Sequence, residues 1–176
     1  MPRRFVVVSG LPGSGKSTIA RRIGAGLNLD VIDKDDLLEQ SFEGVDVISS
    51  AERQRLSRLA DETMTHLAQA SAGAVIVSFW RREQLSATAG TPTSWLHELP
   101  HVVEVHCVCS PSTAVQRFIA RHRHHGHGDQ ARSAGDLAAQ FIALDALGPI
   151  GIGPLVTVDT TQEIRLAELL EQLATA

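Results

Sequence analysis

Residues 10–17 read Gly-Leu-Pro-Gly-Ser-Gly-Lys-Ser, and this glycine-rich segment constrains the fold more than any other part of the chain. A β-branched run from Phe5 to Ser9 precedes it and is typical of a buried strand. Residues 17–27 follow with apolar side chains at helical spacing. Strand, glycine loop and helix in this order form the arrangement that holds the phosphate groups of a nucleotide.

The residue types in this loop each have a physical reason. Glycine lets backbone N–H groups approach negatively charged oxygens, and the helix that follows adds its positive N-terminal end. Lys16 supplies a point charge toward the outer phosphates, and the Ser17 hydroxyl is a candidate Mg²⁺ ligand. A turn with a chance Lys-Ser pair is disfavoured, because the chain has only two lysines, Lys16 and Lys34. The predicted nucleotide-binding set is Gly10, Gly13, Ser14, Gly15, Lys16, Ser17 and Thr18.

Strand-like and helical segments alternate along the rest of the chain. The 176 residues are enough for one α/β domain, so we expect residues 1–176 to form a single unit. Alternation of this kind predicts a mostly parallel, five-stranded sheet with helices on both faces. The further strands are expected at 29–32, 74–79, 102–109 and 155–158, and the further helices at 49–72, 91–99, 111–121, 137–147 and 162–173. In the long helix, the expected apolar stripe is Leu56, Leu59, Met64 and Leu67.

The composition excludes several classes of protein. The net charge is −4, with 43% hydrophobic and 20% charged residues, which disfavours a general nucleic-acid binder. No apolar run has the length of a membrane span or a signal peptide, so we expect a cytoplasmic protein without membrane contact. Cys107 and Cys109 are interpreted as small buried residues of a strand rather than a disulfide.

Three acids follow the second predicted strand. Asp33, Asp35 and Asp36 lie where parallel sheets bind ligands, beyond the carboxyl ends of the strands. A kinase that phosphorylates an alcohol needs a carboxylate to orient and deprotonate the hydroxyl group. The alternative is a helix N-cap with acids in the first turn, and both can hold together.

Two segments carry a resemblance to a known family: residues 10–18, and Val-Ile-Asp-Lys-Asp-Asp-Leu at 31–37. The chain resembles small P-loop kinases grouped with AAA-type ATPases, polynucleotide kinase, zeta toxin, gluconate kinase and chloramphenicol phosphotransferase. The resemblance implies a three-layer P-loop NTPase fold with a small helical lid, and ATP with Mg²⁺ as cofactors. In polynucleotide kinase, the first Asp of an Arg-Asp-Asp triplet is the base. Lys34-Asp35-Asp36 matches that triplet, so Asp35 inherits the role, with Asp33 as the alternative.

The third strand departs from the family pattern. Ser78 stands where relatives often have an acid, so we expect Mg²⁺ to be held by Ser17, phosphates and water, with Asp33 nearby. Arg81 is a candidate for binding an acidic or phosphorylated substrate. Arg82 is interpreted more simply as part of a solvated helix start.

A basic stretch is expected to form the lid, at about residues 117–135. The resemblance implies that lid arginines close over the transferring phosphate, where Arg121 and Arg123 are the candidates and Arg117 is expected to reach the nucleotide. His122, His124, His125 and His127 are too crowded for an obvious zinc site.

Together these features predict an ATP-dependent kinase for a small hydroxylated molecule such as a sugar, nucleoside or antibiotic. One alternative is a kinase of a 5′-hydroxyl nucleic acid end or a nucleotide sugar, suggested by the arginines. Another is a regulatory nucleotide-binding module without phosphotransfer, suggested by Ser78. Segments 37–55 and 80–100 are expected to build the acceptor pocket, and they carry no pattern that names the acceptor.

Overall fold

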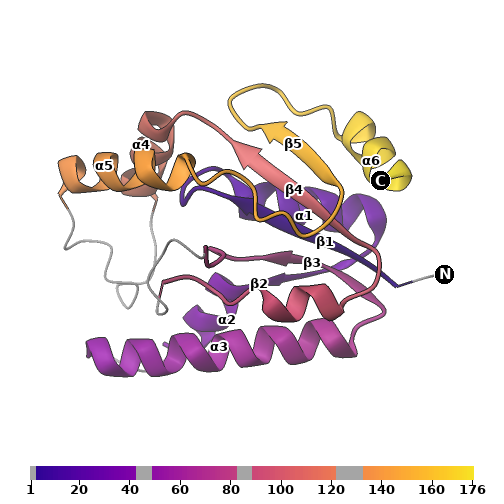
Figure 1. The fold of residues 1–176 in the computed structure, drawn as a ribbon, viewed down its shortest axis with the longest axis horizontal. Helices are drawn as coiled ribbons and strands as arrows, with labels where there is room; N and C mark the ends of the chain where they lie inside the picture. Colours follow the sequence, from indigo (N-terminus) through magenta and orange to yellow (C-terminus); the bar gives the residue numbers. More distant parts are fainter. Residues whose placement is uncertain (1–2, 43–48, 83–88, 122–132) are drawn as a thin grey trace.

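The computed structural model describes residues 3–42, 49–82, 89–121 and 133–176. Five strands form one sheet in the order β2-β3-β1-β4-β5 (Figure 1). The predicted sheet is confirmed, and every pairing among the described strands is parallel. The strands are β1 (Arg4–Gly10), β2 (Asp30–Asp33), β3 (Gly73–Val77), β4 (Val102–Val108) and β5 (Leu155–Asp159).

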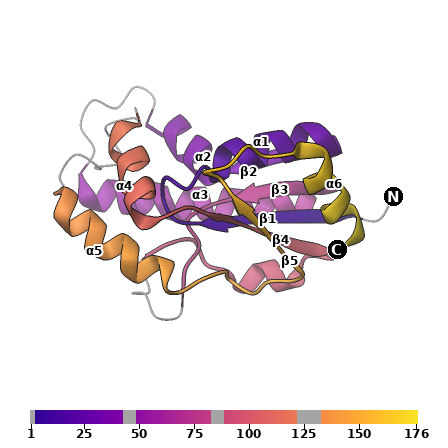
Figure 2. The same cartoon turned by 90° about the horizontal axis from the view of Figure 1, so that it is seen from above.

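Helices cover both faces of the sheet and its carboxyl edge. Helices α1 and α6 pack on one face, and α3 with a short 3₁₀ helix, η1, packs on the other. Figure 2 shows α4 and α5 beyond the tips of the strand arrows. The helices are α1 (Lys16–Leu27), α2 (Lys34–Gln40), α3 (Ser50–Ala70), η1 (Ser94–Glu98), α4 (Pro111–Ala120), α5 (Ala134–Asp145) and α6 (Leu166–Thr175).

The first strand lies at the centre of the sheet and explains the two cores. Phe5 and Val7 point to the α3 face, while Val6 and Val8 point to the α1 face, and all four are fully buried. A strand buried on both faces needs a continuous apolar run, which is what residues 5–8 supply. The glycine loop therefore begins at a fixed point, the carboxyl end of the central strand.

The apolar stripe of α3 differs from the one predicted. Leu56 and Met64 are buried as expected, but Leu59 and Leu67 are each 46% exposed. The buried set continues through Ala60 and Ala68, because α3 packs with an exact four-residue step that small side chains permit. Among the described helices, none is long and apolar enough to cross a membrane.

Candidate active site

The glycines of the phosphate loop are required by close backbone contacts. Gly13 has a φ of +79°, and a Cβ there would lie 2.3 Å from the Ala114 carbonyl oxygen. Gly10 has a φ of +133°, and a Cβ there would lie 2.3 Å from the Cys107 carbonyl oxygen. L-residues with side chains rarely adopt such backbone angles, so the loop conformation selects glycine.

The start of α1 is left open for a ligand. Gly15 is the N-cap and provides no side-chain hydrogen bond to the first turn. The buried Ser14 hydroxyl also has no hydrogen-bond partner among the described residues. Free N–H groups at a helix N-terminus attract anions, so this end of α1 fits a phosphate group.

Lys16 lies folded against the loop that carries it. Its ammonium donates hydrogen bonds to the carbonyl oxygens of Gly10 at 3.1 Å and Leu11 at 2.8 Å. Burial lowers the pKa of Lys16, and the Cys107, Asp35 and Asp33 groups nearby oppose that shift. A phosphate group would supply the negative charge that this desolvated cation needs.

Ser17 and Asp33 meet between α1 and β2. The Ser17 hydroxyl donates to the Asp33 carboxylate at 2.5 Å, and the Asp35 N–H donates to its other oxygen at 3.0 Å. Burial raises the pKa of Asp33, and the hydrogen bond from Ser17 partly offsets this. A hydroxyl and a carboxylate are hard oxygen donors of the kind that Mg²⁺ accepts, so these two residues fit a magnesium site.

The acids after β2 have separate positions. Asp33 is the N-cap of α2, which confirms the capping interpretation of this segment. Asp36 is exposed and forms an ion pair with Arg21 at 3.1 Å. Asp35 is half-buried and close enough to Lys16 to raise the pKa of that lysine. Of the three acids, Asp33 contacts Ser17 of the phosphate loop, and Asp35 lies within electrostatic reach of Lys16.

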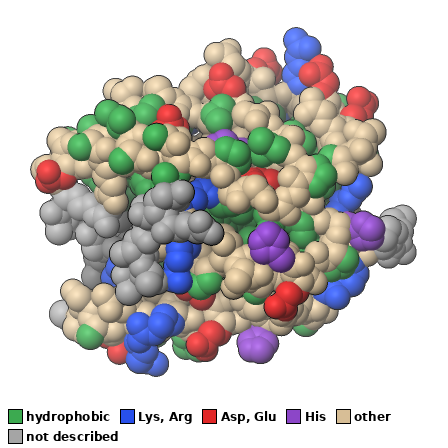
Figure 3. Space-filling view, viewed as in Figure 1, with side chains coloured by type: hydrophobic (Ala, Val, Ile, Leu, Met, Phe, Trp, Pro, Cys, Tyr) green, Lys and Arg blue, Asp and Glu red, His purple; other side chains and the backbone are tan. Residues whose placement is uncertain are grey.

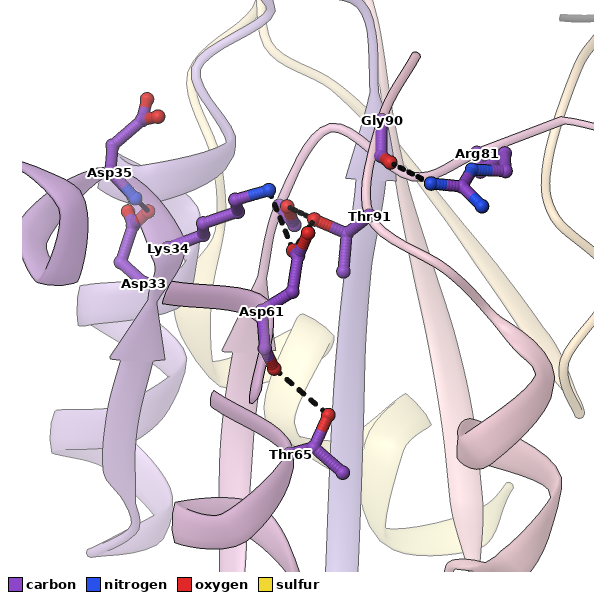
Figure 4. Close-up of polar contacts among 9 residues, drawn as sticks. Asp33, Lys34, Asp35, Asp61, Thr65, Arg81, Gly90 and Thr91 are labelled. Atoms are coloured by element: carbon purple, nitrogen blue, oxygen red, sulfur yellow. Dashed lines mark hydrogen bonds and ion pairs between the residues drawn. The ribbon is translucent and has the colours of Figure 1, made fainter. Parts of the chain in front are cut away.

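A polar network links three elements next to these acids (Figure 4). The Lys34 ammonium lies 2.6 Å from the Asp61 carboxylate, with the two side chains 12% and 17% exposed. Thr91 donates to Asp61 at 2.8 Å, and the Ser78 and Thr91 hydroxyls are 2.6 Å apart. A carboxylate thus does reach the end of β3, but it comes from α3, and Lys34 already neutralises it.

Sequence reasoning missed Asp61 and Thr91. The available signal was position: Asp61 and Thr65 each come one residue after a buried residue of α3, Ala60 or Met64, so they lie at the border of its buried face. Thr65 donates to the Asp61 carbonyl oxygen at 2.9 Å. Their partner, Lys34, is 27 positions away, so the pairing depends on the packing of α2 against α3.

The two arginines after β3 each hydrogen-bond to a backbone carbonyl oxygen of a later loop. Figure 4 shows Arg81 beyond Thr91 as seen from Asp33 and Asp35, and its guanidinium donates to the Gly90 carbonyl oxygen at 3.2 Å. The solvated helix start predicted for Arg82 is wrong, because residues 80–82 are not helical and Arg82 is half-buried. Its guanidinium donates to the Gly148 carbonyl oxygen at 2.7 Å, which ties it to the loop after α5.

Two arginines, Arg117 in α4 and Arg121 just after it, lie near the phosphate loop. Arg117 donates to the Thr160 hydroxyl and carbonyl oxygens, both at 3.0 Å, and Thr160 lies beside Gly15. Arg121 lies over the Phe118 ring at 4.2 Å, close enough to Lys16 to lower its pKa. Arg123 and the rest of the predicted lid from 122 to 132 lie outside the described residues, as do residues 43–48 and 83–88 of the expected acceptor segments.

The profile of a family described as an AAA domain matches residues 5–140, which include the phosphate loop, the acids after β2 and the start of α5. The chain belongs to this AAA domain family.

Comparison with known proteins agrees with the family assignment. A shikimate kinase of Corynebacterium efficiens is 51% identical over 41 residues, which are 23% of this chain and 24% of that protein. The chain therefore matches about a quarter of the length of this curated relative.

Solved structures of the same fold cover nearly the whole chain. A candidate kinase of Chloroflexus aurantiacus J-10-fl superposes with a TM-score of 0.75 at 23% identity, over 99% of this chain and 95% of that one. A shikimate kinase of Bacteroides thetaiotaomicron superposes with a TM-score of 0.62 at 16% identity, over 98% of this chain and 97% of that one. At these identities the likeness establishes the fold, an α/β P-loop fold with a five-stranded parallel sheet.

Proposed function

We propose that this protein is a kinase that transfers the γ-phosphate of ATP, with Mg²⁺, to a hydroxyl group of a small molecule. The observation that carries the proposal is the convergence of Lys16, Asp33 and Asp35 at the carboxyl edge of the sheet. A phosphate loop alone binds a nucleotide, but a half-buried carboxylate beside its lysine also provides a base for an acceptor. The shikimate kinase relative supports the same class of reaction.

Each residue has a role in this proposal. The loop N–H groups and Lys16 bind the phosphates, Ser17 would ligate Mg²⁺ while Asp33 orients the Ser17 hydroxyl, and Asp35 orients the acceptor hydroxyl and takes its proton. Bound Mg²⁺ would neutralise charge on the phosphate oxygens. Arg121, together with Arg123, stabilises the transferring phosphate, a contribution of ~10³-fold or more in rate where it has been measured in such enzymes.

The proposal favours a small-molecule acceptor over a nucleic acid. Acidic and basic side chains are interspersed on the face shown in Figure 3, where a nucleic-acid surface would gather basic ones. Both cysteines are free thiols, which supports a reducing, cytoplasmic environment as part of the proposal.

The test compares two neighbouring acids. ATP-to-ADP turnover should be measured with pooled sugars, nucleosides and other alcohols for wild type, Asp35→Asn and Asp36→Asn. We expect an acceptor to stimulate wild type and Asp35→Asn to lose ~10²-fold or more, the usual scale for a general base. Asp36→Asn is the matched control, because Asp36 is paired with Arg21 at the surface and should retain turnover.

Other outcomes would redirect the assignment. If Asp35→Asn leaves turnover intact while Asp33→Asn abolishes it even at saturating Mg²⁺, the base is Asp33. If ATP binds but no acceptor stimulates any variant, phosphotransfer to a small alcohol is rejected, and a regulatory nucleotide-binding role takes its place.

A further inference from the structure

A small pocket opens beside the phosphate loop, at the carboxyl ends of β1 and β4. It is partly open to solvent, and four separate segments of the chain surround it. Lys16 is hydrogen-bonded to the carbonyl oxygens of two lining residues, so the pocket adjoins the point where phosphate would be transferred. The lining residues are Gly10, Leu11, Phe79, Arg82, His106, Leu144, Asp145 and Gly148.

Arg82 lines this pocket, and only part of its hydrogen-bonding capacity is used. One terminal nitrogen, Nη2, donates to Gly148, but Nη1 is buried and has no hydrogen-bond partner among the described residues. Burial lowers the pKa of Arg82, and Glu104 opposes the shift without contacting the guanidinium at ion-pair distance. A buried N–H of a cation without a partner is costly, and an anionic oxygen in the pocket would remove that cost.

His106 brings a hydrogen-bond acceptor to the same pocket. The fully buried Glu104 carboxylate accepts N–H donors from Ile150 and Gly151 and, at 2.5 Å, the hydroxyl of Ser9. Because the Ser9 proton is directed to Glu104, its oxygen must accept from His106 Nδ1, 2.7 Å away. Burial lowers the pKa of His106, so the ring is neutral near pH 7 and Nε2 carries a free lone pair.

Two acids, Glu104 and Asp145, lie near Arg82 and His106. The Glu104 oxygens already accept hydrogen bonds from the backbone and Ser9, so they do not compete for a ligand. Asp145 is exposed at the rim and raises the pKa of His106, an effect smaller than that of burial. Apart from the Asp145 carboxylate at its rim, the pocket presents one cationic donor, Arg82, and one neutral acceptor, His106.

We propose that this pocket selects the kinase acceptor, and that the acceptor carries a carboxylate or phosphate group as well as hydroxyl groups. Arg82 Nη1 binds an oxygen of the anionic group, and His106 Nε2 accepts a hydrogen bond from a hydroxyl. Both are specificity residues for the reaction, and the assignment rests on the proposed kinase function.

The test uses matched acceptors that differ in charge. Phosphorylation rates should be measured for glycerol, glycerate and glycerol 3-phosphate, and for glucose, gluconate and glucose 6-phosphate. Wild type should prefer an acid or a phosphate ester over its neutral parent, and the favoured arm identifies the anionic group. Arg82→Gln should lower kcat/KM for the anionic acceptor ~10–100-fold, the range for a hydrogen bond to a charged group, without changing KM for ATP. Arg165→Gln removes an exposed arginine paired with Glu168 and is the matched control.

Two substitutions at His106 distinguish the role of its Nδ1 from that of its Nε2. His106→Asn keeps an amide N–H directed to Ser9 but has no acceptor at the position of Nε2. We expect it to raise the acceptor KM ~10-fold, consistent with one lost hydrogen bond, with little change in melting temperature. His106→Gln places an amide oxygen near the position of Nε2 and should recover part of that loss.

Two results would overturn the pocket assignment. If neutral acceptors are preferred, or if Arg82→Gln lowers rates for neutral and anionic acceptors equally, the inference fails while the kinase function stands. If nothing is phosphorylated although ATP binds, the kinase function fails. Calorimetric binding of gluconate or glucose 6-phosphate that is lost in Arg82→Gln would then support the pocket alone, and absence of binding would overturn it.

Discussion

Burial disfavours the charged form of two side chains at the phosphate loop, Lys16 and Asp33. It lowers the pKa of Lys16 and raises the pKa of Asp33, so the charged form of each is less favourable than it would be in water. A bound nucleotide supplies phosphate oxygens for the lysine, and Mg²⁺ supplies a positive charge for the aspartate. The site is therefore arranged for the magnesium complex of a nucleotide rather than for its own stability.

Asp33→Asn should stabilise the free protein and weaken magnesium binding. The amide can still accept the Asp35 N–H and donate to Ser17, but it removes a buried charge. Because the folded pKa of Asp33 is raised, wild type loses stability as pH rises from the unfolded value, about 4, through the folded pKa. The melting-temperature advantage of Asp33→Asn should therefore grow across that window and stay constant above it.

The functional cost should be visible in the same variant. Loss of an outer carboxylate that orients a metal ligand lowers metal affinity or activity ~10–100-fold, which a Mg²⁺ titration of ATP turnover would measure. Asp36→Asn is the control and should show neither effect, because its ion pair with Arg21 is exposed. A lower melting temperature for Asp33→Asn at pH 8 would contradict the assignment of a destabilising buried charge.

At the scale of helices and strands, local patterns predicted the existence of elements better than their contacts. The helix predicted at 49–72 corresponds to α3 (Ser50–Ala70), and Ser49 caps it by accepting the Glu52 N–H at 3.1 Å. The buried face of α3 was predicted less well. The prediction followed the leucines, whereas two of the four buried residues are the alanines Ala60 and Ala68. Asp61 was missed for a related reason, because a single acid on a long polar helix is usually solvated.

The Lys34–Asp61 pair should couple α2 to α3 energetically. Both side chains are mostly buried and 2.6 Å apart, so Asp61→Asn leaves Lys34 with a weaker partner. A double-mutant cycle with Lys34→Met and Asp61→Asn should give a coupling energy of ~1–3 kcal/mol in the free energy of unfolding. The exposed pair Arg55–Glu52 is the control, and its cycle should give ~0.5 kcal/mol or less. Equal coupling in both cycles would show that burial does not strengthen the Lys34 pair.

Arg117 should connect α4 to the loop after β5 on the nucleotide side. It is exposed and makes two hydrogen bonds to Thr160, which lies beside Gly15 of the phosphate loop. Arg117→Ala should raise KM for ATP a few-fold to ~10-fold, with kcat nearly unchanged, because the contact serves binding rather than the transferring phosphate. A fall in kcat at saturating ATP would instead place Arg117 among the groups that stabilise the transition state.

At the scale of the whole molecule, strand order decides which polar residues become buried. The alternation of strands and helices predicts a parallel sheet, but it does not give the order β2-β3-β1-β4-β5. That order makes β4 an interior strand, so Glu104 is fully buried and must bind the chain that covers it. The burial of Arg82 could not be predicted for the same reason, because its partner Gly148 belongs to a loop 66 residues away. The geometry of the phosphate loop could be predicted, because its residues form one continuous segment between β1 and α1.

Glu104 should be the most sensitive buried polar residue of the fold. Its carboxylate accepts backbone N–H groups from Ile150 and Gly151 and the Ser9 hydroxyl, and so joins two central strands to the loop that lines the acceptor pocket. Glu104→Gln replaces one accepting oxygen by an NH₂ group that faces a donor, so at least one buried N–H loses its partner. The expected loss is ~1–3 kcal/mol in the free energy of unfolding, measured by urea titration.

Ser9→Ala tests whether the hydrogen bonds among Ser9, Glu104 and His106 serve the stability of the fold or the binding of the acceptor. It leaves the backbone N–H bonds to Glu104 in place, so it should cost less, ~1 kcal/mol, while releasing His106 Nδ1 from its fixed partner. Acceptor KM should then rise in Ser9→Ala, although the loop from 148 to 152 stays anchored. If Ser9→Ala destabilises the protein as much as Glu104→Gln and leaves acceptor KM unchanged, the network serves only the fold. The opposite pattern would show that one buried carboxylate both anchors a loop and, through Ser9, fixes the hydrogen-bonding state of a pocket histidine.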